Sequence, residues 1–420
     1  MFSNKDLRKL IIPLVIEQLL AVTIGMADTV MVSSCGEAAV SGISLVDSIN
    51  FLLITLFSSL ATGGAVIASQ YIGRGDHKSA SLAAKQLFYA SLALSAVLGI
   101  IAVFFRKPVL NMVFGSIEAD VMAHAQIYFL LSAISYPFLA VYNAGAALFR
   151  SMGDSRTTML ISILMNTINI VGNASFNLRL PNGCGGAATA SLVSRAVGAI
   201  IITVLLLNPH RIIFYDKLHK PEIHLSMLKS ILQIGVPNGL ENSIFQIGKI
   251  LVASIVSGFG TISITANAVA GNLASLQVIP GMALGMAMIT VVGQCIGAKD
   301  YEAVKKYTKK LMLITYGVVW AMTLLMLLFS KQILSFYSLS EETTTMTMEV
   351  FIVHGICAVI VWPLAFALPN ALRAANDVRF TMIVSLLSMW IFRIGFSYIL
   401  AIYFNMGILG TWIAMCIDWF

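Results

Sequence analysis

Long apolar segments, separated by short polar breaks, are the feature that most constrains the fold of this chain. Most of them contain the roughly 20 residues that a helix needs to cross a hydrocarbon core of about 30 Å. They predict an all-α integral membrane protein with twelve transmembrane helices. Segment 406–420 is too short to cross, so we expect the last helix to be incomplete. The segments are 10–33, 45–70, 87–105, 121–147, 158–178, 186–207, 231–256, 262–295, 311–329, 348–370, 381–404 and 406–420.

The low charge content also indicates a lipid environment. Hydrophobic residues make up 58% of the 420 residues and charged residues 11%, whereas a soluble domain carries about 25% charged residues. This composition excludes a soluble globule, a disordered chain and a secreted disulfide scaffold. We therefore expect the chain to lie in a lipid bilayer and not to bind nucleic acid. The net charge of +7 is then a signal of membrane orientation.

Lysines and arginines are distributed very unevenly between alternate loops. Only Arg106, Lys107, Arg179 and Lys331 fall in one set of loops, and nearly all the other basic residues fall in the other set. Because cytoplasmic loops carry the excess of basic residues, this pattern predicts a cytoplasmic N-terminus. We expect a multi-pass protein of the plasma or inner membrane.

The chain repeats itself over about half its length. Matched residues recur 223 or 224 positions apart, in register, through six apolar segments. Such a repeat predicts an N-terminal six-helix lobe at 1–207, a cytoplasmic linker at 208–230 and a C-terminal lobe at 231–420. Each copy contains an even number of helices, so the copies are related by a pseudo-two-fold axis along the membrane normal, which is a plan typical of transporters. The matches include Pro13 with Pro237, Glu17 with Glu241, Gln70 with Gln294, Asp76 with Asp300, and Arg150 with Arg373.

Several motifs resemble the multidrug and toxic compound extrusion (MATE) family in their order and duplication. They are Gly25-Met-Ala-Asp28-Thr in the first helix, Gln-x-Ile-Gly-x-x-Asp after helices 2 and 8, Phe149-Arg150-Ser-Met-Gly-Asp154, and Gly185-Gly186-Ala-Ala-Thr189. The resemblance covers essentially the whole chain. It implies two six-helix lobes that export organic cations in exchange for protons or sodium, with no cofactor.

Four polar residues are candidates for a site that couples transport to an ion. Asp28, Asn169, Asn173 and Thr189 all fall about 8–14 Å below the outer ends of helices 1, 5 and 6. Asn169 and Asn173 are four residues apart, so they share one helix face. Their oxygens suit Na⁺ or a carboxyl group that exchanges a proton. The alternative is a helix–helix hydrogen-bond cluster.

The resemblance adds roles to these four residues. In the DinF-like branch of the family, Asp28, Asn169 and Thr189 match residues of the cation site, and Asn173 stands where that branch has a second carboxylate. The missing negative charge weakens a sodium site and favours proton coupling. The NorM-like branch uses acids in helices 7 and 10, but here Gln246 stands at the helix 7 position and helix 10 has no acid.

The second lobe offers candidates for the substrate cleft. Glu241 lies about 15 Å into helix 7, where it meets a cationic substrate or, alternatively, forms a buried contact with Arg393 or with hydroxyl groups. Lys249 either extends to the interface or marks an anionic or zwitterionic substrate. Gln246 lies between these two residues. We expect Arg195 and Arg393 to be structural.

Three functions fit this architecture to different degrees. The leading hypothesis is a secondary antiporter for organic cations, acting as a monomer. A flippase for lipid-linked oligosaccharides shares the architecture but requires several basic residues in the cleft. A membrane enzyme requires paired acids or a histidine cluster, and the sequence contains neither at one interface, so we do not expect an enzyme. The sequence also lacks a nucleotide-binding loop.

Overall fold

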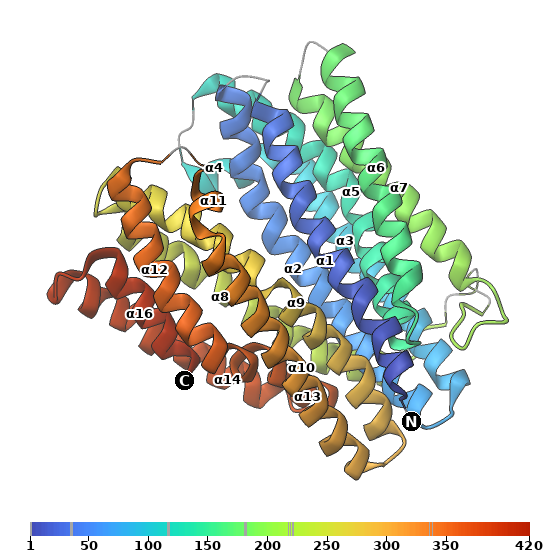
Figure 1. Ribbon diagram of the computed structural model, residues 1–420. Coiled ribbons are helices and arrows are strands. Elements are labelled where there is room, and N and C mark those ends of the chain that lie inside the picture. Colours follow the sequence, from blue (N-terminus) through green and yellow to red (C-terminus); the bar gives the residue numbers. More distant parts are fainter. Residues whose placement is uncertain are drawn as a thin grey trace. The chain divides into compact units, whose positions relative to one another are not determined.

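In the computed structural model, every regular element of the described chain is a helix. The structure describes residues 2–33, 37–115, 118–179, 183–216, 218, 220, 222–335, 337 and 339–420, and only the backbone for 23–33, 37, 176–179, 183 and 184. Figure 1 shows long helices running alongside one another in each half of the chain.

Seven α-helices form the first half of the chain. Two of them, α2 and α5, contain 37 and 33 residues and make the most extensive helix–helix contact, so they form the centre of this bundle. Their side chains supply much of a buried cluster around Phe57, Phe129 and Tyr136. The helices are α1 (Asn4–Ser33), α2 (Glu37–Gly73), α3 (His77–Phe104), α4 (Arg106–Phe114), α5 (Ala119–Ser151), α6 (Ser155–Arg179) and α7 (Gly183–Leu206).

The second half contains α-helices and three π-helical turns. The π-helical turns interrupt the predicted segments 348–370 and 381–404, and such turns occur often at functional sites. The elements are α8 (Leu225–Ser257), α9 (Thr261–Gly297), α10 (Tyr301–Leu328), α11 (Ser330–Ser335), α12 (Glu341–Ile360), η1 (Pro363–Ala367), α13 (Leu368–Ala374), α14 (Val378–Ser388), η2 (Met389–Gly395), α15 (Phe396–Tyr398), η3 (Ile399–Tyr403) and α16 (Gly407–Trp419).

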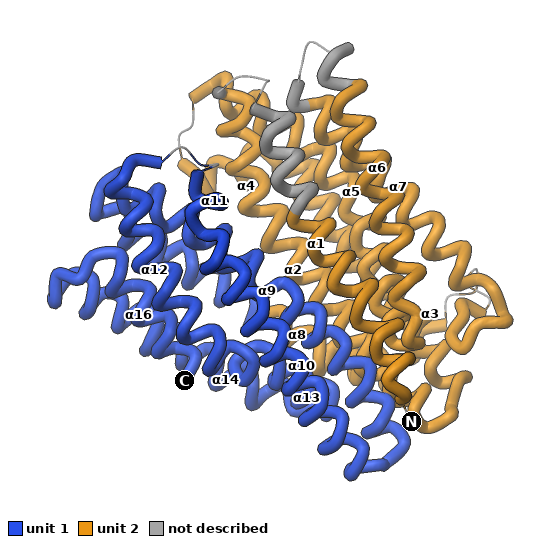
Figure 2. Tube along the Cα trace, viewed as in Figure 1, with its two compact units in different colours: residues 1, 240–420 blue, residues 2–239 orange. Residues whose placement is uncertain are grey.

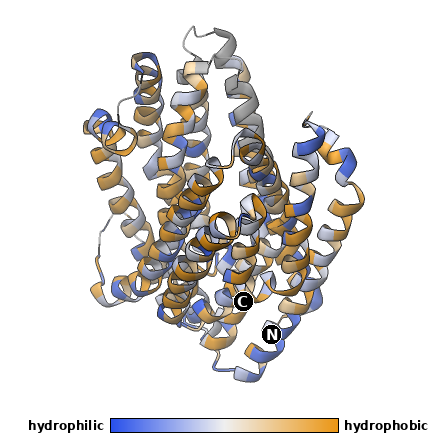
Figure 3. Cartoon of the chain, turned by 90° about the vertical axis from the view of Figure 1, so that its left-hand side faces the viewer, coloured by the Kyte–Doolittle hydropathy of each residue, from blue (hydrophilic) through white to orange (hydrophobic). Residues whose placement is uncertain are grey.

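Each predicted apolar segment coincides with a helix or with a run of consecutive helical elements. Among the residues whose side chains are described, ten helices are long and apolar enough to cross a membrane. Hydrophobic residues cover most of their length, as Figure 3 shows. Helix α16 has 13 residues and is shorter than a membrane span.

The internal repeat extends to local geometry. Helices α2 and α9 both have 37 residues, and α3 and α10 both have 28. The carboxylates of Asp76 and Asp300, 224 positions apart, accept the first-turn backbone N–H groups of Ser79 and Ala303 as N-caps. The bonds from Ser79 hold the pKa of Asp76 below its usual value. The short helices α4 and α11 begin 224 positions apart as well.

The chain divides into two compact units, shown in different colours in Figure 2. Unit 2 comprises residues 2–239 and unit 1 comprises residues 240–420, so helix α8 contributes to both. The predicted lobe boundaries at 207 and 231 remain a prediction.

The segment that follows α7 is held against unit 2 by side-chain bonds. Gln86 of α3 donates to the carbonyl of Glu222 at 2.7 Å and accepts from the backbone N–H of His224 at 3.0 Å. Arg211 forms an ion pair with Asp154 at 3.3 Å. Several separate contacts therefore fix the path of the chain between α7 and α8.

Candidate functional site

Two of the predicted coupling residues meet in unit 2. The amide of Asn173 donates to Oδ1 of Asn169 at 3.1 Å, one turn away on α6. Asn169 in turn donates to the hydroxyl of Ser191 on α7 at 2.9 Å. Asn169 is 5% exposed and Asn173 is fully buried. A buried amide–hydroxyl chain therefore joins α6 to α7 within the apolar part of both helices.

The other two predicted coupling residues are placed differently. Thr189 is half-buried and donates its hydroxyl proton to the carbonyl of Gly185 on its own helix, at 2.7 Å. Its hydroxyl oxygen keeps lone pairs that can accept a hydrogen bond or bind a cation. Asp28 belongs to α1, but its side chain lies outside the described residues. The four-residue site therefore stays a prediction, and sequence reasoning overlooked Ser191 as a member of the chain.

Each unit contains a buried carboxylate–guanidinium pair at repeat-related positions. In unit 2, Glu17 accepts from Arg150 at 3.2 Å through Oε1 and from the hydroxyl of Thr158 at 2.7 Å through Oε2. The side chains of Glu17 and Arg150 are 10% and 18% exposed. This pair ties α1 to the end of α5 and the start of α6.

In unit 1, Glu241 is paired in a related way. Its Oε1 accepts from Arg373 at 2.7 Å and from the hydroxyl of Ser385 at 2.9 Å. Its Oε2 is buried and has no hydrogen-bond partner among the described residues. The hypothesis of a buried contact for Glu241 therefore holds for hydroxyl groups, but the partner cation is Arg373 and not Arg393.

Arg393 pairs instead with Asp418. Their side chains are 5% and 7% exposed, and Nε lies 3.1 Å from Oδ2. The guanidinium carbon of Arg393 also lies 4.8 Å from the ring centroid of Phe245, a cation–π contact. The π-helical turn η2 contains Arg393, and α16 contains Asp418. The prediction that Arg393 is structural agrees with this burial.

The two remaining cleft candidates lie near that pair on α8. The ammonium group of Lys249 lies 5.7 Å from the same Phe245 ring, and the side chain is exposed. Among the described residues, no carboxylate lies within ion-pair distance of Lys249. Gln246 is half-buried. The substrate roles of Glu241, Gln246 and Lys249 stay predictions.

Sequence reasoning gave no functional role to a polar network in unit 2. Asp47 of α2 accepts from the Tyr128 hydroxyl of α5 at 3.0 Å, and Arg195 of α7 donates to Ser135 of α5 at 2.7 Å. The signal was present in the sequence, because Asp47 and Asn50 are three apart and Tyr128, Ser132 and Tyr136 recur every fourth residue on apolar helices.

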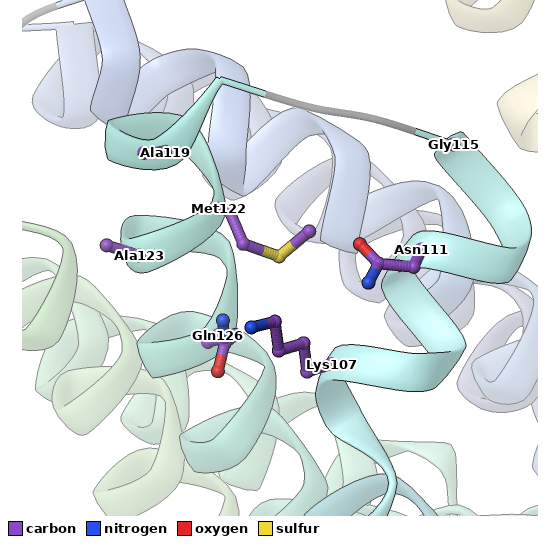
Figure 4. A pocket seen from close by; sticks show the side chains of 7 residues that line it. All are labelled: Lys107, Asn111, Gly115, Ala119, Met122, Ala123 and Gln126. Carbon is purple, nitrogen blue, oxygen red and sulfur yellow. The ribbon is translucent and has the colours of Figure 1, made fainter.

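A cavity of about 640 Å³ opens between α4 and the start of α5. Figure 4 shows Lys107, Asn111 and Gln126 around it, together with Met122 and small residues. None of the predicted coupling residues lines it. Within the described residues, no group of three or more His, Cys, Asp or Glu side chains could hold a metal ion.

Comparisons with known proteins address the whole chain. Residues 13–174 and 237–399 both match the MatE family, and these two stretches begin 224 positions apart. The chain is 28% identical over 419 residues to an uncharacterized transporter, YisQ, of Bacillus subtilis. The match covers 97% of this chain and 89% of YisQ. It is 26% identical over 424 residues to a probable multidrug resistance protein, NorM, of Thermotoga maritima. This match covers 99% of this chain and 89% of NorM.

Solved structures give the same architecture. A MATE structure in the bent conformation has a TM-score of 0.90 and 21% identity, and the match covers 99% of this chain and 91% of that one. A transporter of the MOP superfamily from Pyrococcus furiosus, described as having a binding pocket of reverse polarity, has a TM-score of 0.90, 21% identity and 92% coverage of its chain. The predicted all-α, two-lobe membrane fold is confirmed.

Proposed function

Because the chain belongs to the MatE family, we propose that this membrane transporter is a secondary antiporter, which exports small organic cations in exchange for H⁺ or Na⁺. The names of its relatives, several of which are probable multidrug resistance proteins, support drug-like substrates. The flippase alternative is not favoured, because it requires several basic residues in the cleft. Only three basic residues lie within the predicted membrane segments, and one of them, Arg393, is already neutralised by Asp418.

The observation that carries the proposal is the buried chain of Asn173, Asn169 and Ser191 in unit 2. It places several oxygen atoms at membrane depth without a fixed positive charge among them. Asp28 lies about 8 Å below the same end of α1, by residue count, as Asn173 does on α6. An exchangeable cation near these groups would neutralise the Asp28 carboxylate.

We assign Asp28 the role of coupling residue. An ionised carboxylate at membrane depth is costly, so it binds H⁺ or Na⁺ or takes up water. Binding of the ion from outside changes how α1 packs against α6 and α7, which releases the organic cation outward. Release of the ion inside restores the starting state. The difference in ion affinity between the two states drives the cycle.

Because Asn173 replaces a carboxylate at this site, we infer that H⁺ is the coupling ion in preference to Na⁺. We further propose that the protein acts as a monomer in the plasma or inner membrane with its N-terminus in the cytoplasm, as the distribution of basic residues indicates.

Transport in proteoliposomes tests this function. Ethidium uptake is followed by fluorescence, first under an imposed pH gradient and then under an imposed sodium gradient. We expect uptake above that of protein-free vesicles under the pH gradient. Absence of gradient-dependent uptake in both experiments would contradict the antiporter proposal.

A further inference from the structure

The polar network around Asp47 and Arg195 has the organisation of a binding site. Its uncharged residues are joined by hydrogen bonds. Asn50 donates to Asp47 at 3.2 Å and to Ser132 at 3.3 Å, and Tyr136 donates to Asn50 at 2.8 Å. Ser135 donates to the carbonyl of Ser132 at 2.7 Å and accepts from Arg195. One continuous chain of bonds therefore runs from the acid to the arginine across α2, α5 and α7.

The uncharged residues of this network are buried, and its two charged residues are accessible. Asn50 and Ser132 are 4% and 6% exposed, and Ser135 and Tyr136 are 1% exposed or less. Asp47 is exposed and Arg195 is half-buried. Buried residues that are fixed by their own hydrogen bonds hold the two charged groups in position without closing them off.

Both charged groups keep unused bonding capacity. The two hydrogen bonds to Asp47 end on Oδ1, and Oδ2 has no partner among the described residues. Arg195 uses Nη1 for Ser135 and has four further N–H donors. The bond chain connects Arg195 to Asp47, yet within the described part of the chain the two groups form no ion pair. Two opposite charges thus lie near each other without satisfying each other.

Both charged groups lie on membrane-spanning helices, Asp47 near the start of the predicted apolar segment 45–70 and Arg195 further along segment 186–207. Asp47 lies ten residues from the start of α2, about 15 Å, and Arg195 lies twelve residues from the start of α7, about 18 Å. Lipid contact on such a helix is unfavourable for either charge, so both belong to a water-accessible or ligand-filled region.

We propose that Asp47 and Arg195 bind the two charged groups of an amphipathic zwitterion, with the cationic group on Asp47 and a carboxylate on Arg195. A substrate with only a positive charge meets repulsion from Arg195, and one with only a negative charge meets repulsion from Asp47. A zwitterion satisfies both, and a guanidinium group can hold a carboxylate through two parallel hydrogen bonds. This inference rests on the proposed export function and narrows its substrate class.

A matched pair of dyes tests the proposal. Tetramethylrhodamine carries a delocalised cation and a free carboxylate, and its methyl ester keeps the cation alone. Binding to the purified full chain in detergent is measured by fluorescence polarisation. We expect the acid to bind about tenfold more tightly than the ester, as one charge-assisted contact provides.

Variants separate the two contacts. Arg195→Gln should weaken binding of the acid about tenfold and leave the ester unchanged or slightly tighter, whereas Asp47→Asn should weaken both dyes. Ser48→Ala is the control, because Ser48 is exposed beside Asp47 and donates only to Ser44 on its own helix. Arg195→Lys keeps the charge and should keep part of the preference for the acid.

Equal binding of acid and ester by the unmodified protein would overturn the proposal. So would an Arg195→Gln variant that folds normally, judged by size-exclusion chromatography, and weakens both dyes equally, because that result indicates a purely structural arginine. These measurements need no ion gradient. Absence of gradient-driven transport of both tetramethylrhodamine and ethidium would contradict the antiporter proposal and leave these binding results standing, so the two failures are distinguishable.

Discussion

Corresponding helix pairs of the two units contain different polar groups at corresponding positions. In unit 2, Asn169 of α6 donates a hydrogen bond to Ser191 of α7. Counting 224 positions onward from Asn169 leads to Arg393, and from Ser194 to Asp418. Unit 1 therefore has a buried ion pair between the corresponding helices, where unit 2 has neutral amide and hydroxyl groups.

Under the proposed antiport mechanism, this difference favours unit 2 as the unit that exchanges an ion. In unit 1, the guanidinium of Arg393 already supplies the cation that neutralises Asp418, so no ion from solution is needed there. In unit 2, the amide–hydroxyl chain contains no positive charge of its own. An exchangeable H⁺ or Na⁺ fits unit 2, and unit 1 is internally neutralised at the equivalent place.

The buried pairs of Glu17 with Arg150 and of Glu241 with Arg373 are common to both units. Each links the first helix of its unit to the last turn of a later helix, α5 in unit 2 and α13 in unit 1. Their recurrence indicates a shared role in holding each bundle together.

The largest expected effect comes from breaking the buried pair in unit 1. Arg393→Met leaves Asp418 buried without a cation and should destabilise the protein by about 3–5 kcal/mol. The double variant Arg393→Met with Asp418→Leu removes both charges and should recover most of that loss. Thermal unfolding in detergent measures both. If the double variant is as unstable as the single one, the two side chains do not act as a neutralising pair.

A smaller effect separates the two glutamates. Glu17 uses both carboxylate oxygens, whereas Glu241 uses only Oε1. Glu17→Gln disturbs two differently directed contacts and should cost about 1–3 kcal/mol more than Glu241→Gln, which leaves Oε1 in place as an amide acceptor. The order of the two unfolding temperatures is the measurement. The reverse order would show that Glu241 bears the heavier structural role.

Adding a charge to unit 2 should sharpen its ion preference. Asn173→Asp supplies a second carboxylate beside Asn169, and one added hard oxygen anion should raise sodium affinity about tenfold. Sodium-dependent ethidium transport over a range of sodium concentrations detects this gain. The matched change in unit 1, Ser397→Asp, lies 224 positions away and should give no sodium dependence.

The smallest effect concerns the hydroxyl partner of Asn169. Ser191→Ala removes one interhelical hydrogen bond and should cost about 0.6 kcal/mol, the usual value in a membrane bundle. Thr189→Ala should cost less, because its hydroxyl bonds only its own helix among the described residues. Reversible unfolding in mixed micelles resolves the difference. A larger cost for Thr189→Ala would place Thr189 and not Ser191 in the polar chain.

The sequence predicted the twelve helical segments and the repeat well, because both follow from apolar length and from residues that recur in register. It did not predict the π-helical turns, since a single extra residue within an apolar run leaves no signal in composition. The contact between Asn169 and Asn173 followed from their four-residue spacing.

Partners on other helices were harder to predict. Arg373 falls between the predicted apolar segments 348–370 and 381–404, but it belongs to the last turn of α13, close enough to reach Glu241. Depth estimates placed Thr189 beside the asparagines but did not fix its rotation about α7, and Ser191 faces Asn169 instead. Rotation about a helix axis depends on packing against neighbouring helices, which residue spacing alone does not specify.

The central claim is that unit 2 couples export to ion entry through Asp28. The most direct test compares Asp28→Asn with the unmodified protein in proteoliposomes, because the amide imitates a permanently protonated acid. We predict that Asp28→Asn folds, still exchanges labelled ethidium across the membrane without a gradient, and loses its response to an imposed pH or sodium gradient. Gradient-driven uptake by Asp28→Asn at the rate of the unmodified protein would contradict the account.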